Sequence, residues 1–332
     1  MPDLLRPLAI GRVRLPNNLV LSPMAGFSDL ALRVLARRHG AGLVCSEMVS
    51  ATSVEREVPG TLVKMRTLAE EAPMSIQLFG TDPARVADAA RDVGERCAIL
   101  GFNMGCPAHQ IKRQGCGAAL LDRPALAMDL VRAIKGASDK PLLVKMRAGN
   151  GGPMDVVAFA RGLEAAGADG LIFHARTAKM GYSGKSDWDL IRAVKEAVSI
   201  PVVGNGDVVD GASAKAALER SGADGLALGR AALGDPRVFG RIARHLATGE
   251  EDDGPVPREQ IEDFEAYVAM ARAAGIGEPQ ILRQAQAFTK GFRDATRLRS
   301  ELSRGVTPEG ALERMRAAVE RAEAWRAARA TA

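Results

Sequence analysis

Two cysteines, Cys106 and Cys116, lie in a stretch dense with glycine and basic residues, NMGCPAHQIKRQGCGAAL at positions 103–120. Two thiols at this spacing could form a disulfide, supply half of a metal site, or act singly as a nucleophile or an acid. The chain holds four cysteines and four histidines, with no C-x-x-C pair and no metal-binding spacing between the two residue types. A disulfide framework and structural zinc are therefore disfavoured, and we predict no metal site.

The elements that must position these thiols form a regular alternation. Short apolar runs ending in polar or glycine-rich turns occupy 18–26, 43–49, 74–80, 97–107, 141–149, 170–178, 200–207 and 225–233. Most lack polar alternation, which is typical of strands buried on both faces of a parallel sheet. Between them lie helix-like segments, several beginning with Asp or Ser and ending in Gly. The near-repeat of AGADGLIFHAR (166–176) in SGADGLALGR (221–230) supports the same register. We predict an α/β fold, a (β/α)8 TIM barrel.

The sequence changes character after the last apolar run. A polar, acidic stretch precedes helical sequence that continues almost to the end of the chain. We predict a barrel domain over 1–247, a linker over 248–257 and a small all-α helical domain over 258–332. The alternative is a final barrel helix followed by a disordered tail, but the apolar spacing of Ala311, Met315, Val319 and Ala322 favours a folded domain.

Composition narrows the class of protein. Hydrophobic residues make up 47% of the chain, yet no uncharged apolar run is long enough to span a membrane, and the N-terminus does not resemble a signal peptide. We therefore expect a cytoplasmic protein without a membrane partner, and nothing demands more than a monomer. The net charge of +5 points weakly to an anionic partner.

Polar residues at the ends of the predicted strands indicate a ligand. The turns at Gly206 and Gly229 end the seventh and eighth predicted strands, where such barrels commonly bind phosphate, and Arg230 could add a charge-assisted bond. Gln77, Lys145 and His174 lie on the third, fifth and sixth runs and could hold a planar, electron-accepting ring. Together these features suggest flavin mononucleotide (FMN), with its ring over the barrel mouth.

Several phrases in order along the chain carry a family resemblance: LSPMAGFSD, SEM, IQLFG, NMGCPA, VKMR, FHART, GNGD and GADGLALGRAALGDP. From about residue 8 to about residue 300 the chain closely resembles the tRNA-dihydrouridine synthases. TKGF and LRSEL, within 289–302, resemble the bacterial B-type subgroup, once named for a nitrogen-regulation locus. The resemblance implies an FMN-binding enzyme with tRNA as its partner, which reduces the C5–C6 double bond of uridines and uses NADPH as reductant.

The resemblance also implies roles for individual residues. Cys106 would be the catalytic acid. The FMN contacts would be Pro23, Met24, Gln77, Lys145, His174, Asn205, Gly206, Asp207, Gly229 and Arg230. The target uracil would be held by Asn103 and Arg147, with Arg176 and Tyr182 nearby. Lys112 and Arg113, in the loop after Cys106, would touch RNA. Arg283, Lys290, Arg293 and Arg297 have spacings that place them roughly on one helical face, where a stripe of positive charge would neutralise phosphates.

The implied chemistry suits a thiol acid. Hydride delivery to uracil C6 leaves a charge that needs a proton at C5, and a free thiol, with a pKa of about 8.5, is mostly protonated at neutral pH. We expect no catalytic role for Cys116. The sequence departs from the family at His109-Gln110, Cys116 and Ala285, which leaves the details of RNA contact open. Two alternatives remain: a flavin barrel acting on a free pyrimidine, as dihydroorotate dehydrogenases do, and a non-catalytic RNA-binding barrel.

Overall fold

The computed structural model describes residues 4–330 apart from 153 and 252. Its centre is a closed barrel of parallel strands in the order β10-β3-β4-β5-β6-β7-β8-β9. The strands are β3 (Leu19–Leu21), β4 (Leu43–Ser50), β5 (Met74–Phe79), β6 (Ile99–Met104), β7 (Leu142–Arg147), β8 (Gly170–His174), β9 (Val202–Asn205) and β10 (Gly225–Leu228). They fall in the apolar runs of the sequence, and the predicted TIM barrel is confirmed.

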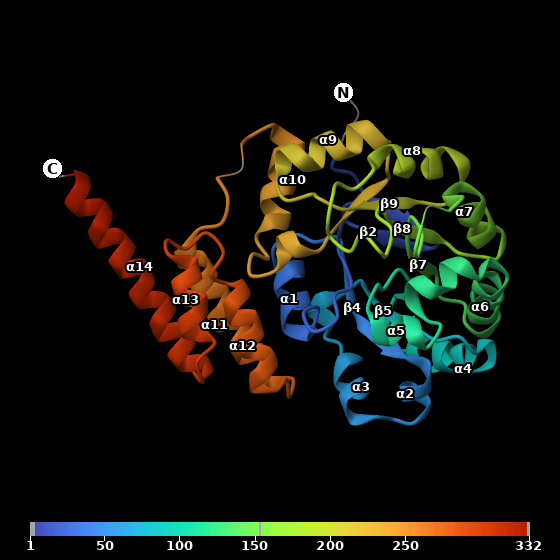
Figure 1. Cartoon of the computed structure of the whole chain (residues 1–332), viewed down its shortest axis with the longest axis horizontal. Coiled ribbons are helices and arrows are strands. Elements are labelled where there is room, and N and C mark those ends of the chain that lie inside the picture. Colours follow the sequence, from blue (N-terminus) through green and yellow to red (C-terminus); the bar gives the residue numbers. More distant parts are fainter. Residues whose placement is uncertain (1–3, 153, 252, 331–332) are drawn as a thin grey trace.

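Helices cover the outside of the barrel (Figure 1). They are α1 (Leu30–Arg38), α2 (Ala51–Glu55), α3 (Pro59–Lys64), α4 (Pro83–Gly94), α5 (His109–Arg113), α6 (Pro124–Ala137), α7 (Val156–Ala165), α8 (Trp188–Ala197), α9 (Gly211–Ser221) and α10 (Val238–Thr248), with short 3-10 turns η1 (Ala69–Glu71), η2 (Gly117–Asp122) and η3 (Arg230–Ala232). Several begin where the sequence predicts, because an aspartate side chain accepts a hydrogen bond from the first turn. Asp29, Asp82, Asp155, Asp187 and Asp210 do so.

An N-terminal hairpin closes one end of the barrel. Its strands are β1 (Leu8–Ile10) and β2 (Val13–Leu15), which pair antiparallel. Leu8, Ile10 and Leu15 are buried in one cluster with inward residues of the barrel strands, including Leu143 and Ile172. The sequence did not reveal this hairpin, because two strands of three residues are too short to show a period.

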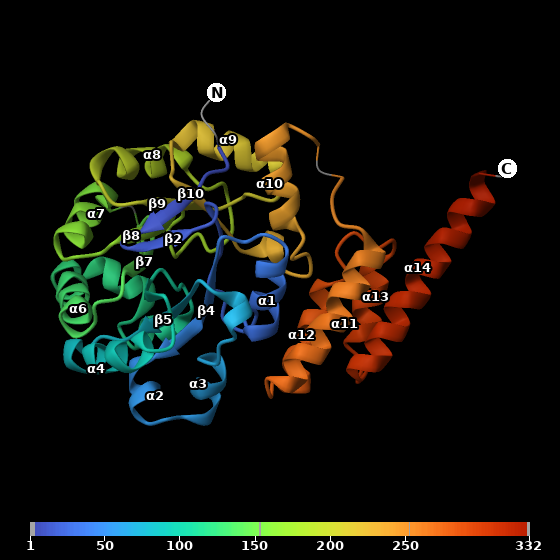
Figure 2. The same ribbon diagram turned by 180° about the vertical axis from the view of Figure 1, so that it is seen from behind.

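The C-terminal segment is helical and packs on one side of the barrel (Figures 1 and 2). It consists of α11 (Pro257–Ala273), α12 (Glu278–Ala287), α13 (Ala295–Leu302) and α14 (Pro308–Ala330). Its core is shared with α1, since Leu32 and Leu35 lie in the same buried cluster as Phe264, Ile281 and Met315. We refer to residues 257–330 as the helical segment; that it forms a domain in its own right stays a prediction.

We predict that Ile10→Ala destabilises the barrel. The Ile10 side chain is fully buried among the strand residues, and removing such a side chain typically lowers the free energy of unfolding by about 2–5 kcal/mol. Urea unfolding of the purified protein measures the change. Arg14→Ala, an exposed position in the same hairpin, is the control and should unfold at the wild-type midpoint. Equal stability of Ile10→Ala and Arg14→Ala would contradict the role of the hairpin.

Candidate functional site

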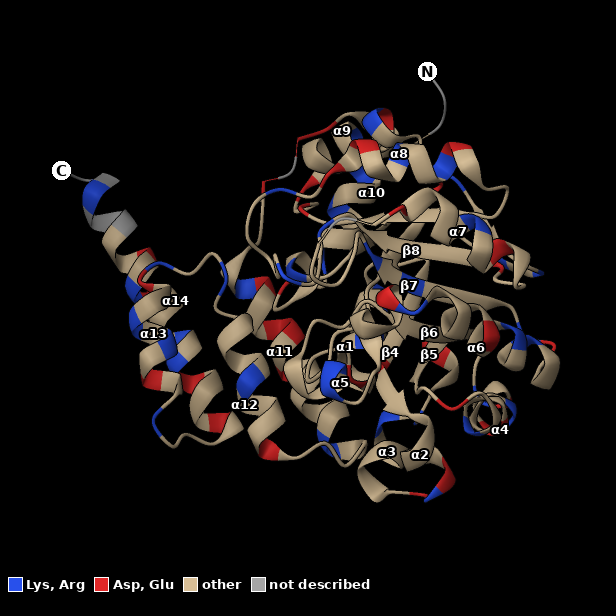
Figure 3. Cartoon of the chain, turned by 45° about the vertical axis from the view of Figure 1, so that its right-hand side comes forward, with Lys and Arg blue, Asp and Glu red and all other residues tan. Residues whose placement is uncertain are grey.

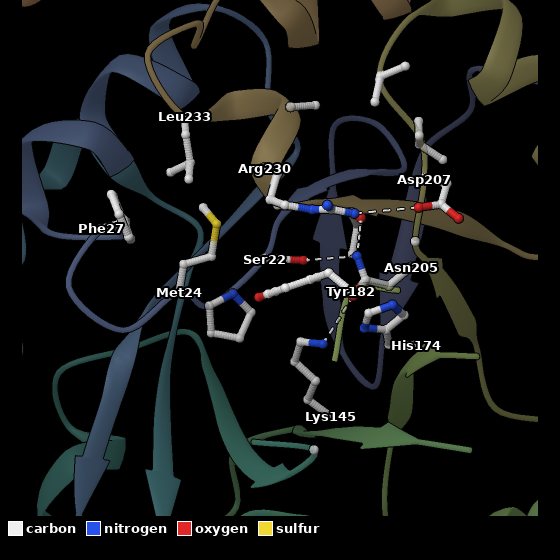
Figure 4. Close-up of a pocket in the computed structure, with 18 of the residues that line it drawn as sticks. Ser22, Met24, Phe27, Lys145, His174, Tyr182, Asn205, Asp207, Arg230 and Leu233 are labelled. Carbon is white, nitrogen blue, oxygen red and sulfur yellow. Dashed lines mark hydrogen bonds and ion pairs between the residues drawn. The ribbon is translucent and has the colours of Figure 1, made fainter. Parts of the chain in front are cut away.

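A cavity of about 950 Å³ opens at the carboxyl ends of the strands. Every residue predicted to hold flavin lines it, as do Cys106, Asn103, Arg147, Tyr182 and Lys290. Figure 4 shows Lys145, His174 and Asn205 pointing into this space from three strands, with Met24 on the facing side. The rim of a parallel barrel is where its strands present their last side chains, so the fold itself brings these residues together.

The floor of the cavity is a hydrogen-bonded set centred on Asn205. Its amide oxygen accepts from Lys145 Nζ at 3.1 Å, and its amide nitrogen donates to the Ala227 carbonyl at 2.6 Å. Burial and the nearby positive charge of Arg147 lower the pKa of Lys145 to about 7. The amine is thus partly neutral at physiological pH, and a negative charge placed beside it would favour the ammonium form.

Asn103 fixes the turn that carries Cys106. Its amide oxygen accepts from the backbone N–H groups of Gly105 at 3.1 Å and Cys106 at 2.9 Å, and its nitrogen donates to Gln77 Oε1 at 2.8 Å. Cys106 is half-buried and lines the cavity. The thiol of Cys106 is therefore held at the end of β6 by a side chain that itself borders the same space.

Cys116 has a different environment. It is buried, its thiol faces the Gln114 carbonyl at 3.7 Å, and burial raises its pKa. It is not among the residues that line the cavity. The adjacent Gly117 packs against Cys106, because a Cβ atom at Gly117 would lie 2.9 Å from the Cys106 carbonyl oxygen. The stretch around Cys116 therefore supports the Cys106 turn from outside.

Two arginines hold the loop 177–184. Arg147 donates through one nitrogen to the carbonyls of Thr177 at 3.0 Å and Gly181 at 2.9 Å, and it also lines the cavity. Arg176 is buried and donates to the Gly184 carbonyl at 2.6 Å. The loop carries Tyr182, whose ring lies beside the cavity.

Arg176 does not border the cavity, contrary to its predicted place near the uracil. Its guanidinium also forms an ion pair with both carboxylate oxygens of Asp207, at 2.8 and 2.7 Å. All these partners are protein groups, so the charge of Arg176 is neutralised within the protein. Tyr182 lines the cavity, with the Arg230 guanidinium 4.5 Å from the centre of its ring, and its contact with the uracil stays a prediction.

His174 is a neutral imidazole in this site. Burial, followed by the charges of Lys145, Arg147, Arg176 and Arg230, lowers its pKa to about 2. One ring nitrogen lies 3.3 Å from Arg176. Neutral His174 can offer a hydrogen bond to a ligand but no charge.

In the turn after β9 the backbone is closely approached by its neighbours. Gly206 has φ of +128°, and a Cβ atom there would lie 2.5 Å from Ser186 Oγ, so only glycine fits. Burial raises the pKa of the next residue, Asp207, but hydrogen bonds from the Ser186 N–H and Arg176 lower it more, so the net shift is downward. Arg230 approaches the same carboxylate at 3.5 Å. This end of the cavity joins a rigid glycine turn to an exposed guanidinium, which suits a phosphate.

The predicted basic stripe is not formed. α12 ends at Ala287 and α13 begins at Ala295, so Lys290 and Arg293 lie in the connection between two helices. Gly291, with φ of +78°, turns the chain there. The spacing of these basic residues would place them on one face only if a single helix contained all four of them. Two helices and a connection contain them instead. Lysine, arginine and acidic residues are interspersed over the helical segment (Figure 3).

The four residues predicted to form the stripe lie in different surroundings. Arg283 reaches the loop after β3, where a Cβ atom on Gly26 would meet its guanidinium at 2.5 Å. Arg293 covers the Trp325 ring at 3.3 Å, and Arg297 pairs with Glu301 at 3.0 Å. Lys290 alone enters the cavity. Lys112 and Arg113 lie on α5, outside the cavity lining.

The cavity also includes residues that sequence reasoning did not select. Phe27, Met48, Leu233, Asp235, Arg241, Gly254 and Pro255 line it. Gly254 and Pro255 belong to the linker between α10 and α11, and only the path of that linker over the barrel places them here. Within the described part of the chain, no group of three or more metal-ligating residues is found, and no helix is long and apolar enough to cross a membrane.

The structure is that of a TIM-barrel protein with a cavity at the carboxyl ends of its strands. A 2-naphthoyl-CoA reductase complex has a similar structure, with a TM-score of 0.59 at 15% identity, covering 73% of this chain and 52% of that one. The old yellow enzyme homologue from Zymomonas mobilis gives a TM-score of 0.51 at 14% identity, covering 80% and 96%. At these identities the likeness concerns the fold.

Sequence comparison identifies the family. The dihydrouridine synthase (Dus) family model matches residues 20–323. A probable tRNA-dihydrouridine synthase from Rhodobacter capsulatus is 37% identical over 96% of this chain and 99% of its own length. A tRNA-dihydrouridine synthase B from Pseudomonas aeruginosa is 41% identical over 76% of both chains. The chain belongs to the dihydrouridine synthase family, and the resemblance drawn from its motifs is confirmed.

We predict a pH-dependent stability difference between Lys145→Met and the wild-type apoprotein. Because the Lys145 pKa is lowered, the folded state binds fewer protons than the unfolded state between about pH 7 and the ordinary lysine value near 10.4. Wild-type stability therefore gains from Lys145 deprotonation as pH rises through this window. Lys145→Met, which lacks the penalty, should be more stable than wild type at pH 7 and lose that advantage by about pH 10.

Urea unfolding of the apoprotein at several pH values measures this difference. Lys185→Met, at an exposed position in the loop before α8, serves as the matched control and should follow the wild type at every pH. A constant offset between Lys145→Met and wild type from pH 7 to 10 would contradict the lowered pKa.

Proposed function

We propose that this protein reduces the C5–C6 double bond of uridines in tRNA to 5,6-dihydrouridine, with FMN bound at the barrel mouth and NADPH as reductant. The observation that carries the proposal is that one cavity gathers the residues of the flavin pattern together with Cys106. Family membership and the names of the relatives support the same reaction. We also propose that the protein acts as a monomer and in the cytoplasm, where tRNA is found.

The residues present fit FMN. The volume of about 950 Å³ accommodates a three-ring ligand with its side chain and leaves room for a base. Gln77, Lys145 and Asn205 supply hydrogen-bond donors and acceptors for the heteroatoms of the ring, and Pro23 and Met24 offer an apolar surface. Gly206, Asp207, Gly229 and Arg230 form the end that would hold the phosphate.

Bound and reduced FMN would supply the hydride for uracil C6; the remaining tasks belong to the protein. Cys106 would donate its thiol proton to C5, and Asn103 keeps the thiol at the cavity by fixing its backbone. Arg147 would stabilise negative charge at a uracil carbonyl, since its guanidinium borders the cavity and is fixed by two carbonyl groups. Lys145 would place positive charge beside the reduced ring.

Binding of tRNA would draw on residues around the cavity opening. A uridine must leave its stack to enter a barrel mouth, at a cost of a few kcal/mol that other contacts offset. Tyr182 is 60% exposed on the loop over the cavity and would contact the base or its neighbours. Arg283 lies at the loop after β3, and Lys112, Arg113, Arg293 and Arg297 would neutralise phosphates further away.

We predict that Cys106→Ala retains FMN, which NADPH still reduces, but forms dihydrouridine about 10²- to 10⁴-fold more slowly. The physical reason is that the variant keeps the cavity and loses the proton donor. Nucleoside mass spectrometry of tRNA measures the product, and the flavin absorbance measures binding and reduction. Cys116→Ala, the matched control, removes the neighbouring thiol and should retain wild-type turnover.

Three outcomes would count against parts of the proposal. Wild-type turnover by Cys106→Ala would remove the assignment of the acid. Turnover of free orotate with none of tRNA would point to a free-pyrimidine dehydrogenase. A protein that does not bind FMN would point to a non-catalytic RNA-binding barrel.

A further inference from the structure

The helical segment docks on two of the barrel loops that border the cavity. On the loop between β3 and α1, Gln284 donates to the Phe27 carbonyl at 2.8 Å and Tyr267 donates to Asp29 Oδ2 at 2.7 Å. On the loop between β10 and α10, Gln260 donates to the Gly234 carbonyl at 2.8 Å. These loops also carry Met24 and Arg230. The cofactor end of the barrel is thus clamped from outside by one structural unit.

Gly234 is also packed tightly against the end of α12. Gly234 has φ of +65°, and a Cβ atom on it would lie 2.0 Å from the carbonyl oxygen of Ala287, the last residue of α12. Backbone therefore meets backbone at this point. The position of the connection that follows α12 is fixed against the turn η3 as a result.

Lys290 leaves that connection and reaches the turn. Its ammonium donates to the Ala231 carbonyl at 2.8 Å and contacts the Arg230 carbonyl at 3.4 Å. Both acceptors belong to η3, directly after the Gly229 turn that borders the cavity, and Lys290 lines the cavity beside them. Carbonyl oxygens repel an anion, so an ammonium that binds two of them makes the turn more favourable for a phosphate.

Two acidic residues that line this end of the cavity are both paired with arginines. Asp235 and Arg241 line the same wall and bind each other through two hydrogen bonds, at 3.1 and 2.6 Å. Asp207 is paired with Arg176 at 2.7 Å and lies 3.5 Å from Arg230, so two arginines share this one carboxylate. Lys290 and Arg230 thus add positive charge from two separate parts of the chain.

We propose that Lys290 is a positioning residue for the cofactor phosphate, which holds the Arg230–Ala232 turn from the helical segment and so completes the FMN site. The inference rests on the proposed function, because it takes FMN as the ligand. It replaces the tRNA contact that the spacing of basic residues predicted for Lys290. The helical segment then has a second task, which is to build the cofactor site.

The test compares FMN with riboflavin, which has the same ring and no phosphate. Affinities of both for the apoprotein are measured by quenching of flavin fluorescence in wild type, Lys290→Met and Lys290→Arg. We expect Lys290→Met to bind FMN about tenfold more weakly and riboflavin as wild type does, and Lys290→Arg to recover most of the FMN affinity. Arg304→Met, exposed in the same segment, should leave both affinities unchanged.

Other results would overturn the inference. Equal loss of FMN and riboflavin affinity in Lys290→Met would show general damage to the site. Unchanged FMN affinity with weaker tRNA binding would return Lys290 to RNA contact. If Lys290→Met does not fold, Lys290→Gln, which keeps a donor without charge, takes its place with the same expectations. Failure of the wild type to bind FMN at all would defeat the proposed function itself, and this inference with it.

Discussion

Closure of the barrel is the constraint on which the site depends. β10 pairs with β3 in parallel, with Leu226 opposite Leu19 and Leu228 opposite Leu21, so the first and last strands of the barrel are neighbours. This pairing brings the turn at Pro23 beside the turn at Gly229, although about 200 residues separate them in sequence. Without closure, the two sides of the candidate flavin site would stand at opposite edges of an open sheet.

Inside the closed rim, the polar side chains are held by one another as well as by the strands. Asn205 links β9 to Lys145 on β7 and to the backbone of β10, and Asn103 links Gln77 on β5 to the Cys106 turn. Buried polar groups of this kind need their partners, because an unsatisfied group in the interior is costly. The network therefore keeps functional side chains in fixed places before any ligand arrives.

The sequence predicts the barrel well and its surroundings less well. Strands such as β6 are buried along their whole length, so each appears as an apolar run, and the polar residue at its end marks the rim. Sequence reasoning therefore places the residues on the barrel strands, such as Lys145 and His174, and these residues line the cavity. The hairpin at Ile10 is too short to give such a signal.

Residues outside the strands are where the sequence misleads. The spacing of Arg283 and Lys290 suggests one helical face, but a glycine turn at Gly291 separates two helices and sends Lys290 into the cavity. Arg176 lies two residues after the end of β8, yet its partners are Asp207 and carbonyl groups of the next loop. In both cases the direction of a long side chain depends on a distant segment, which local patterns do not encode.

The central claim is that this cavity, loaded with FMN, reduces uridine in tRNA. The most direct measurement incubates the FMN-loaded protein with NADPH and an unmodified tRNA transcript, and follows both nucleotide oxidation and nucleoside composition by mass spectrometry. The account predicts dihydrouridine, a gain of two hydrogens per modified base, matched by an equal amount of NADPH oxidised without oxygen, and no product without FMN. Complete reduction of bound FMN with every uridine in the tRNA unchanged would contradict it.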